Sequence, residues 1–387
     1  MNKADIVYLC RKTSDLASTS TNQERKKLWG QASYVDQWRG LPPKDMSHGI
    51  PITIGLEYAM WAKVLGFDIK KYYTEGRTYL EAQLRAKVYK FTHFNDDTPI
   101  DKTINIWLGS PFELSLFGLM PVYLPGEEPW IPRTPVIHNE EDLKRMEYPD
   151  FYASGLMPQV HRMYEKIKEL VEQEGFSVGF PTWMRGPFGV AVFLRGMENL
   201  LVDMKVRSEF VHKLMRFIVD SRKQWFIERA KFLDTGIEKG ILDNDDVNCP
   251  TLSPELYKEF VLPYEKELRE FHGGISYWHS CGDITPLLEL IGAIPEIELL
   301  HVGPWTSLEA AVRVFKDTPL EKCLHPVRDV QGATEEEIER NLKEIVRLGQ
   351  NASITIRADS IQVLYSLKQD LESVKLWISI AQRLVKS

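Results

Sequence analysis

Seven short apolar runs, most of them followed by an amphipathic segment, limit most strongly how this chain can fold. Apolar runs of this length are typical of buried strands, and apolar residues at helical spacing fill much of the sequence between them. The expected strands cover residues 104–108, 176–180, 240–242, 275–278, 299–302, 322–324 and 353–357. Strand–helix alternation indicates a parallel sheet, and this number of units favours a closed (β/α)8 barrel over an open sheet.

The first hundred residues do not follow this alternation. Residues 1–50 are polar and irregular and end in a breaker cluster, whereas residues 55–66 and 77–92 have helical spacing. We therefore expect an α/β protein with a largely helical N-terminal extension over residues 1–100 and a barrel over residues 101–387. A Pro/Gly/Trp-rich stretch over residues 109–135 is expected to form a long ordered loop or lid.

Composition excludes several classes of protein. Forty-eight basic residues face 55 acidic ones, a net charge of −7, which argues against a nucleic-acid partner because phosphate binding needs an excess of Lys and Arg. No apolar run is long enough to span a bilayer, and the start of the chain has no apolar core of a signal peptide. The four cysteines are widely scattered, which fits a reducing compartment. We expect a cytoplasmic protein without a membrane partner.

Polar and ionisable residues recur directly after the expected strands. In α/β barrels the chemistry takes place at the carboxyl ends of the strands, so these residues are the candidates for a site. They are Asp243, Asn244, Asp245 and Asp246 after one strand, His279 and Cys281 after the next, and His325, Arg357 and Asp359 after later ones. Sequences typical of nucleotide-binding loops or of a serine nucleophile elbow do not occur.

His279 and Cys281 are the residues here that point most directly to a metal. Imidazole nitrogen and thiolate sulfur are zinc ligands, and a catalytic zinc takes three protein ligands and keeps one open position. Asp359 on a later strand could be the third ligand. The same pattern also fits a histidine packed beside a buried thiol, and the acidic run at 243–246 also fits a solvated turn.

Tryptophan is abundant, with ten residues in the chain, and Trp183 and Trp278 fall near expected strand ends. Packing in the core is the usual place for such a ring. The alternative is an aromatic-walled pocket for a flat substrate, with Asn244, Trp183 and Trp278 in contact with it.

Several segments, in order, resemble the uroporphyrinogen decarboxylase superfamily. They are Gly186-Pro187-Phe188-Gly189 after a strand, the acidic run at 243–246 followed by LSPELYKEFVLPY at 252–264, HSCGD at 279–283, and His325-Pro326-Val327 before a Thr-Glu-Glu-Glu helix start. The resemblance covers roughly residues 100–387 and implies a (β/α)8 barrel.

The superfamily includes porphyrinogen decarboxylases and corrinoid-dependent methyltransferases. The stretch at 34–40 lacks the arginine pair that the resemblance would require of a decarboxylase. The methyltransferase branch carries H-x-C and a later cysteine that together bind zinc. His279 and Cys281 match the first two positions, whereas the third falls on Asp359. A carboxylate in place of a thiolate leaves a harder metal, which suits an oxygen ligand.

The resemblance therefore implies a methyltransferase component of an O-demethylase. Such an enzyme takes the methyl group from a methoxylated aromatic compound and passes it to the cob(I)alamin of a partner corrinoid protein. Zinc would be held by His279, Cys281 and Asp359, and catalytic roles fall to Asp245, Asp246, His325 and Arg357. The corrinoid-binding sequence D-x-H-x-x-G does not occur, so the corrinoid must come from the partner.

Other readings remain open from the sequence. Transfer of methyl from methylcobalamin to a thiol such as coenzyme M is the first alternative, a docking protein without turnover the second, and porphyrinogen decarboxylation the third. Residues 1–100 either pack on the barrel or form the contact of a homodimer.

Overall fold

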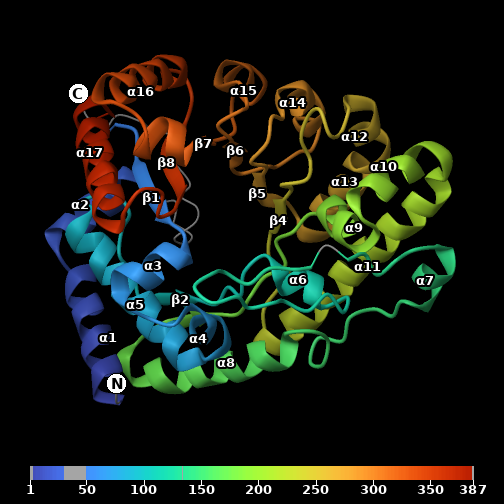
Figure 1. Ribbon diagram of the computed structural model, residues 1–387, viewed down its shortest axis with the longest axis horizontal. Helices are drawn as coiled ribbons and strands as arrows, with labels where there is room; N and C mark the ends of the chain where they lie inside the picture. The colour runs from blue at the N-terminus through green and yellow to red at the C-terminus, as the bar shows by residue number, and fades with distance from the viewer. Residues whose placement is uncertain (1–2, 30–48, 133, 386–387) are drawn as a thin grey trace.

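A computed structural model describes residues 3–29, 49–132 and 134–385 and is drawn in Figure 1. The strands within these ranges are β1 (Ile52–Leu56), β2 (Thr103–Asn105), β3 (Ser177–Gly179), β4 (Gly240–Asp243), β5 (Ile275–His279), β6 (Leu300–Val302), β7 (Leu320–Leu324) and β8 (Ile354–Ile361). The predicted strands are therefore present in order, together with β1, which was not expected.

Helices precede the first strand and connect the later ones. The first half of the chain contains α1 (Lys3–Ala17), α2 (Ser20–Leu28), α3 (Tyr58–Leu65), α4 (Ile69–Thr74), α5 (Gly76–His93), α6 (Pro111–Ser115), α7 (Glu140–Arg145), α8 (Met157–Val171) and α9 (Pro187–Arg195). The second half contains α10 (Met197–Val206), α11 (Ser208–Leu233), α12 (Pro254–Phe260), α13 (Leu262–His272), α14 (Leu288–Ile291), α15 (Leu308–Val314), α16 (Glu335–Gly349) and α17 (Leu367–Val385). Short turns of other helix types cover Glu172–Glu174, Thr285–Leu287 and Pro326–Gln331. In the described ranges we find no helix with the length and apolar character to cross a bilayer.

The strands follow the order of a (β/α)8 barrel, which confirms the predicted fold class. Six of the described strands form one parallel sheet in the order β1-β8-β7-β6-β5-β4, and β2 pairs in parallel with β3. A parallel bridge between Arg185 and Asp243 joins the segment after β3 to β4. In Figure 1 the helices from α9 to α17 lie outside β4–β8, while α1 and α8 lie on the side of α5.

The N-terminal part differs from the prediction in two ways. Residues 1–50 were expected to be irregular, but α1 and α2 lie within them. Residues 55–66 were expected to be one helix, but β1 ends at Leu56 and α3 starts at Tyr58. Because β1 pairs with β8, the barrel takes its first strand from the part assigned to the helical extension, and residue 100 does not separate the two. The strand was missed because its run is only five residues long and contains Gly55.

The edge of β1 that faces away from β8 is closed by side chains. The backbone N–H groups of Ile52 and Ile54 donate to the carboxylates of Asp97 and Asp96, each at 3.0 Å. Both aspartates are buried, and Lys90 Nζ lies 3.3 Å from Asp96 Oδ2. A strand edge needs acceptors for its N–H groups, and here carboxylates provide them instead of a neighbouring strand. We call this closure between β1 and β2 the seam.

Alternation along the strands separates an outer core from the lumen. Leu242, Trp278 and Leu300 belong to the large core between the sheet and the helices. Their sequence neighbours Ile241, Tyr277 and Leu299 form a small separate cluster, which Met184 joins. Successive side chains on a strand point to opposite faces, so this second set faces the barrel interior. By the same alternation, Asp243 and His279 also belong to the interior face.

Asp96 is expected to be a main support of the seam. Asp96→Ala removes the acceptor of Ile54 N–H and leaves the buried Lys90 without its counter-ion, so the free energy of unfolding should fall by about 3 kcal/mol. Asp96→Asn keeps an oxygen acceptor and should lose less. Urea unfolding followed by circular dichroism measures both, with the exposed Asp317→Ala as control. Equal stability of Asp96→Ala and the control would contradict this account.

Candidate metal centre at the barrel mouth

Strands β4 and β5 place three potential metal ligands side by side. Asp243 and His279, the last residues of the two strands, are paired in register, and Asn244 N–H donates to His279 C=O at 2.8 Å. Asp245 and Cys281 each follow two residues after these strand ends. Among the described residues, Asp245, His279 and Cys281 form a group whose potential ligand atoms all lie within 4.8 Å of one another.

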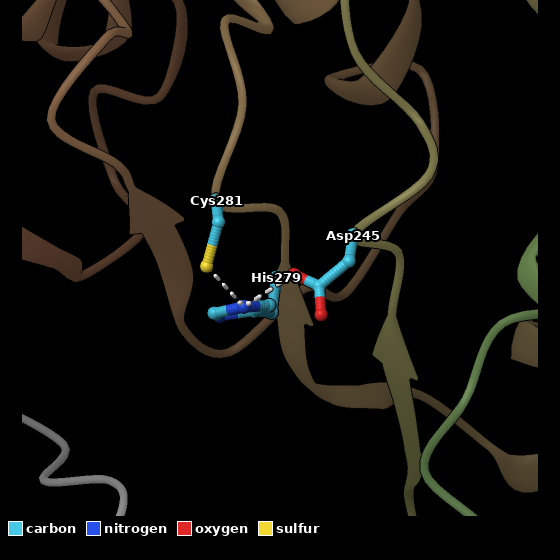
Figure 2. Close-up of side chains that lie close together, drawn as sticks. All are labelled: Asp245, His279 and Cys281. Carbon is cyan, nitrogen blue, oxygen red and sulfur yellow. Dashed lines mark hydrogen bonds and ion pairs between the residues drawn. The ribbon is translucent and has the colours of Figure 1, made fainter. Parts of the chain in front are cut away.

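His279 Nε2 is the centre of the cluster. It lies 3.1 Å from Asp245 Oδ1 and 3.2 Å from Cys281 Sγ, and the three side chains point toward one another in Figure 2. Asp243 Oδ1 lies 3.9 Å from the same nitrogen and is a buried atom without a hydrogen-bond partner. A mixed set of nitrogen, sulfur and oxygen donors is typical of zinc.

The electrostatics of the cluster favour a cation among these groups. Burial lowers the pKa of His279, but Cys281 and Asp245 outweigh it and raise that pKa well above its usual value. Burial acts to raise the pKa of Asp245, but the His279 hydrogen bond and charge hold it well below the ordinary range. Burial, followed by the charge of Asp245, raises the pKa of Asp243 to about 6. The same groups that stabilise a positive charge on His279 would also stabilise a divalent cation at this position.

The far side of the His279 ring is oriented by a buried chain of polar groups. Tyr277 Oη lies 3.3 Å from His279 Nδ1 and donates to Glu321 Oε1 at 2.8 Å. The tyrosine oxygen is therefore available to accept a hydrogen from Nδ1, which leaves Nε2 free to bind a metal. Metal-binding histidines commonly use their second nitrogen in this way. The residues present therefore fit a zinc ion held by Asp245, His279 and Cys281.

The structure places Asp359, the predicted third ligand, outside this cluster. Asp359 Oδ2 lies 3.1 Å from Arg357 Nε, and a Cβ atom on Gly55 would lie 1.8 Å from Asp359 Oδ1. Arg357 in turn lies near Glu321, 3.9 Å from Nη1 to Oε2. Asp359 and Arg357 thus belong to the polar network of the lumen. Asp245, predicted to be catalytic, takes the position predicted for Asp359.

Asn244 and Trp278 support the site from behind and do not reach the cluster. Asn244 Nδ2, Tyr257 Oη and Trp278 Nε1 all donate to the buried carboxylate of Glu265, at 2.8, 2.6 and 3.1 Å. A Cβ atom on Gly186 would lie 1.8 Å from Asn244 Oδ1, so only glycine fits beside this amide. Both residues are fully buried. Asn244 and Trp278 were predicted to contact a substrate. Here both side chains instead hold the loop after β4 in place through Glu265.

Trp183 is also a core residue. Its ring packs against Phe117 and Trp225, and its indole N–H donates to Arg185 C=O at 3.1 Å. It is fully buried, so it does not form a wall of the site. The expected aromatic pocket is therefore not built from Trp183 and Trp278.

His325 lies at the mouth but in a separate group. Its Nδ1 accepts hydrogen bonds from Val327 N–H and Arg328 N–H at 3.2 and 3.1 Å, so the side chain caps the turn after β7. The exposed ring of Trp305 lies 5.5 Å from the His325 ring, and the Arg328 guanidinium lies over the Trp305 ring, 5.2 Å from its centre.

Arg185 is the charged residue that the sequence analysis did not select. It is buried, its Nη1 lies 3.5 Å from Asp246 Oδ2, and its charge also acts on Asp243 and Asp245. Glu113 on α6 fixes this segment by accepting Met184 N–H at 2.7 Å. Arg185 thus balances the acidic run after β4. Its position in the segment after the expected strand at 176–180, directly before Gly186-Pro187, could have identified it as a candidate.

A second acidic pair lies at the end of β1. Glu57 hydrogen-bonds to Glu128, which anchors the loop after β2 by accepting Tyr58 N–H at 2.7 Å and Tyr73 Oη–H at 3.0 Å. Burial, followed by the charges of Glu128 and Asp359, raises the pKa of Glu57 to about 8. Glu57 is therefore protonated at neutral pH, and its hydroxyl can donate the hydrogen bond to Glu128.

With this geometry established, the chain can be compared with known proteins. The family described as Uroporphyrinogen decarboxylase (URO-D) matches residues 110–364, more than half of the chain. The chain therefore belongs to this family, as the sequence resemblance predicted.

Among solved structures, the chain is similar to a methyltransferase from Methanosarcina mazei, with a TM-score of 0.63 and 14% sequence identity. The similarity covers 88% of this chain and 95% of that chain, and at this identity it supports the fold alone. No curated protein matches the chain.

Zinc binding should distinguish the two candidates for the third ligand. Cys281→Ser and Asp245→Asn each remove a candidate ligand and should weaken zinc binding by about 100-fold or more, because even changes outside the ligand set lower affinity by about 10–100-fold. Asp359→Asn should leave the affinity nearly unchanged. Competition with a chromophoric chelator measures all three. Loss of zinc in Asp359→Asn together with retention in Asp245→Asn would show that Asp359 is the ligand.

Glu57 should make stability depend on pH. Between its unfolded pKa of about 4.5 and its folded pKa of about 8, the folded chain holds a proton that the unfolded chain has released. Stability should therefore fall as pH rises through this window, by up to about 1.4 kcal/mol per pH unit. Glu57→Gln should lose this slope in urea unfolding at several pH values, and the exposed neighbour variant Glu127→Gln should keep it. An unchanged slope in Glu57→Gln would contradict the raised pKa of Glu57.

Proposed function

We propose that this protein is a methyltransferase that removes the methyl group from methoxylated aromatic compounds and passes it to the cob(I)alamin of a partner corrinoid protein. The observation that carries the proposal is the Asp245–His279–Cys281 cluster at the mouth of a URO-D family barrel. The similarity in fold to a methyltransferase supports this class.

The composition of the cluster favours an oxygen-bound methyl group over a thiol. A single sulfur ligand, Cys281, would accompany one imidazole and one carboxylate, and Asp243 adds a second carboxylate nearby. Zinc bound to these residues would act as a Lewis acid at the substrate heteroatom, and a harder ligand set suits oxygen. In this proposal a carboxylate still replaces the third cysteine ligand that the family resemblance implies. That carboxylate is Asp245 and not Asp359.

The proposed reaction breaks the bond between the methyl carbon and the ether oxygen. Its electron pair stays on oxygen, giving a phenolate, while the two electrons of cobalt(I) form the new bond to carbon. Negative charge therefore builds up on the oxygen in the transition state. Groups that stabilise charge where it develops accelerate such a step, and Asp245, His279 and Cys281 would hold the cation there. Arg185 keeps the carboxylates of the loop after β4 in place.

The cob(I)alamin spectrum tests the proposal directly. Anaerobic mixing of the zinc-loaded protein with cob(I)alamin and 2-methoxyphenol should convert the cobalt(I) band to that of methylcobalamin and release catechol. Cys281→Ser and Asp245→Asn should reduce the rate by at least about 100-fold, whereas the exposed Asp317→Asn should not change it.

The same assay distinguishes the proposed reaction from the alternative functions. If a panel of methoxybenzenes with free cobalamin and with a matched corrinoid protein gives no conversion, the proposal is wrong. Thiol-dependent loss of methyl from methylcobalamin would instead support transfer to a thiol such as coenzyme M. Decarboxylation of uroporphyrinogen has less support, since the stretch at 34–40 lacks the expected arginine pair. That stretch lies outside the described residues.

A further inference from the structure

The seam between β1 and β2 borders a cavity that the proposed function does not use. Its volume is about 470 Å³. It reaches from Lys239 and Glu298, next to the amino-terminal ends of β4 and β6, to Leu56 and Trp107, at the carboxyl-terminal ends of β1 and β2. It therefore runs along one side of the lumen, where β1 bonds to Asp96 and Asp97 and not to a strand.

The cavity is separate from the metal cluster. Asp245, His279 and Cys281 are not among its lining residues. Its wall includes Met184 and Ile241, and these two side chains pack in one cluster with Tyr277. Tyr277 in turn contacts His279 through its hydroxyl group, so it stands between the cavity wall and the candidate metal ligands.

The apolar part of the cavity wall is largely aromatic. Tyr58 and Trp107 lie in its wall with their rings stacked at 5.6 Å between centroids. Trp61, Phe91 and Phe180 also line it. Aromatic walls with a few polar groups are typical of sites for flat, mostly apolar ligands.

The charged groups of the wall already have partners of opposite sign. Lys87 pairs with Asp101 at 2.5 Å, Lys90 with Asp96 at 3.3 Å, Arg229 with Glu238 at 3.0 Å and Lys239 with Glu298 at 2.5 Å. A charged ligand would have to displace one of these pairs or enter without a counter-ion, and burial of an unpaired charge is strongly unfavourable. The wall therefore selects for an uncharged ligand.

We infer that the seam cavity binds an uncharged aromatic molecule at a site separate from the metal cluster. An apolar protein cavity of about 150 Å³ is large enough for benzene, and ligand pockets range from about 300 to 1,000 Å³, so one substituted ring fits this volume. This inference does not depend on methyl transfer, because it rests on the wall and its ion pairs.

Bromobenzene is the probe for the first experiment, since it is aromatic, uncharged and free of a methoxy group. Titration of the full-length protein, followed by calorimetry and tryptophan fluorescence, should show binding with a dissociation constant of about 1 mM or tighter. Benzoate, of similar size but charged, should bind at least about tenfold more weakly. No binding of bromobenzene up to its solubility, or equal binding of benzoate, would overturn the inference.

Three variants locate the bound ring. Ala86 lies in the cavity wall on α5, so Ala86→Phe should fill the space and abolish binding, whereas Ala293→Phe on the exposed surface should leave it intact. Asp245→Asn at the metal cluster should also bind bromobenzene normally. Loss of binding in Asp245→Asn with retention in Ala86→Phe would place the ring at the mouth and overturn the inference.

A crystal soaked with bromobenzene gives a result that does not depend on how the variants fold. The anomalous signal of bromine should lie beside Trp107 and Ile241. A signal only at the barrel mouth, or only on the surface, would overturn the inference. Failure of the methyl-transfer assay would leave this result unchanged, so the two proposals can fail separately.

Discussion

The free edge of β1 is the constraint on which the shape of the lumen depends. A parallel barrel closed by eight strands would satisfy the N–H groups of Ile52 and Ile54 with a neighbouring strand. Here the buried carboxylates of Asp97 and Asp96 accept these hydrogen bonds. Carboxylates can do so inside the protein because a cation, Lys90, lies beside Asp96 and because Thr98 donates a further hydrogen bond to it at 2.6 Å. The side-chain closure leaves β2 free to pair with β3 alone and leaves space for the cavity along the seam.

On the opposite side of the barrel β4 pairs directly with β5, and the candidate metal centre lies at the end of this pair. In-register pairing of β4 with β5 fixes Asp243 beside His279, and the next residues carry Asp245 and Cys281 to the same point. The loop after β4 is held by Asn244 and Glu265 from outside the barrel and by Arg185 from the neighbouring strand end. Rigid support of this kind is what a metal site needs, since ligands that are free to move lose affinity and geometry.

The lumen joins these two sides through a chain of ionisable groups. From His279 the contacts pass through Tyr277 and Glu321 to Arg357 and Asp359, next to Gly55 on β1. Burial raises the pKa of Glu321, and the charge of Arg357 opposes that shift. The network orients His279 on one side, and on the other side it pairs Asp359 with Arg357, away from the candidate metal ligands. Most members of this chain are buried and none is a predicted ligand except His279 and Asp359.

The class of fold could be predicted from local patterns, because apolar runs at strand length and amphipathic runs at helix length are visible along the chain. Sequence alone also predicted candidate ligands after the strands, among them His279 and Cys281, which lie only two residues apart. The third ligand could not be chosen this way. Asp245 and Asp359 both follow expected strands, and only the pairing order decides that β4, and not β8, lies beside β5. The sequence could not show that Trp183 and Trp278 are core residues, because a tryptophan near a strand end can face either the helices or the lumen. The structure buries both rings. The seam and its cavity came from tertiary structure alone, because Asp96 and Asp97 act on a strand more than forty residues away.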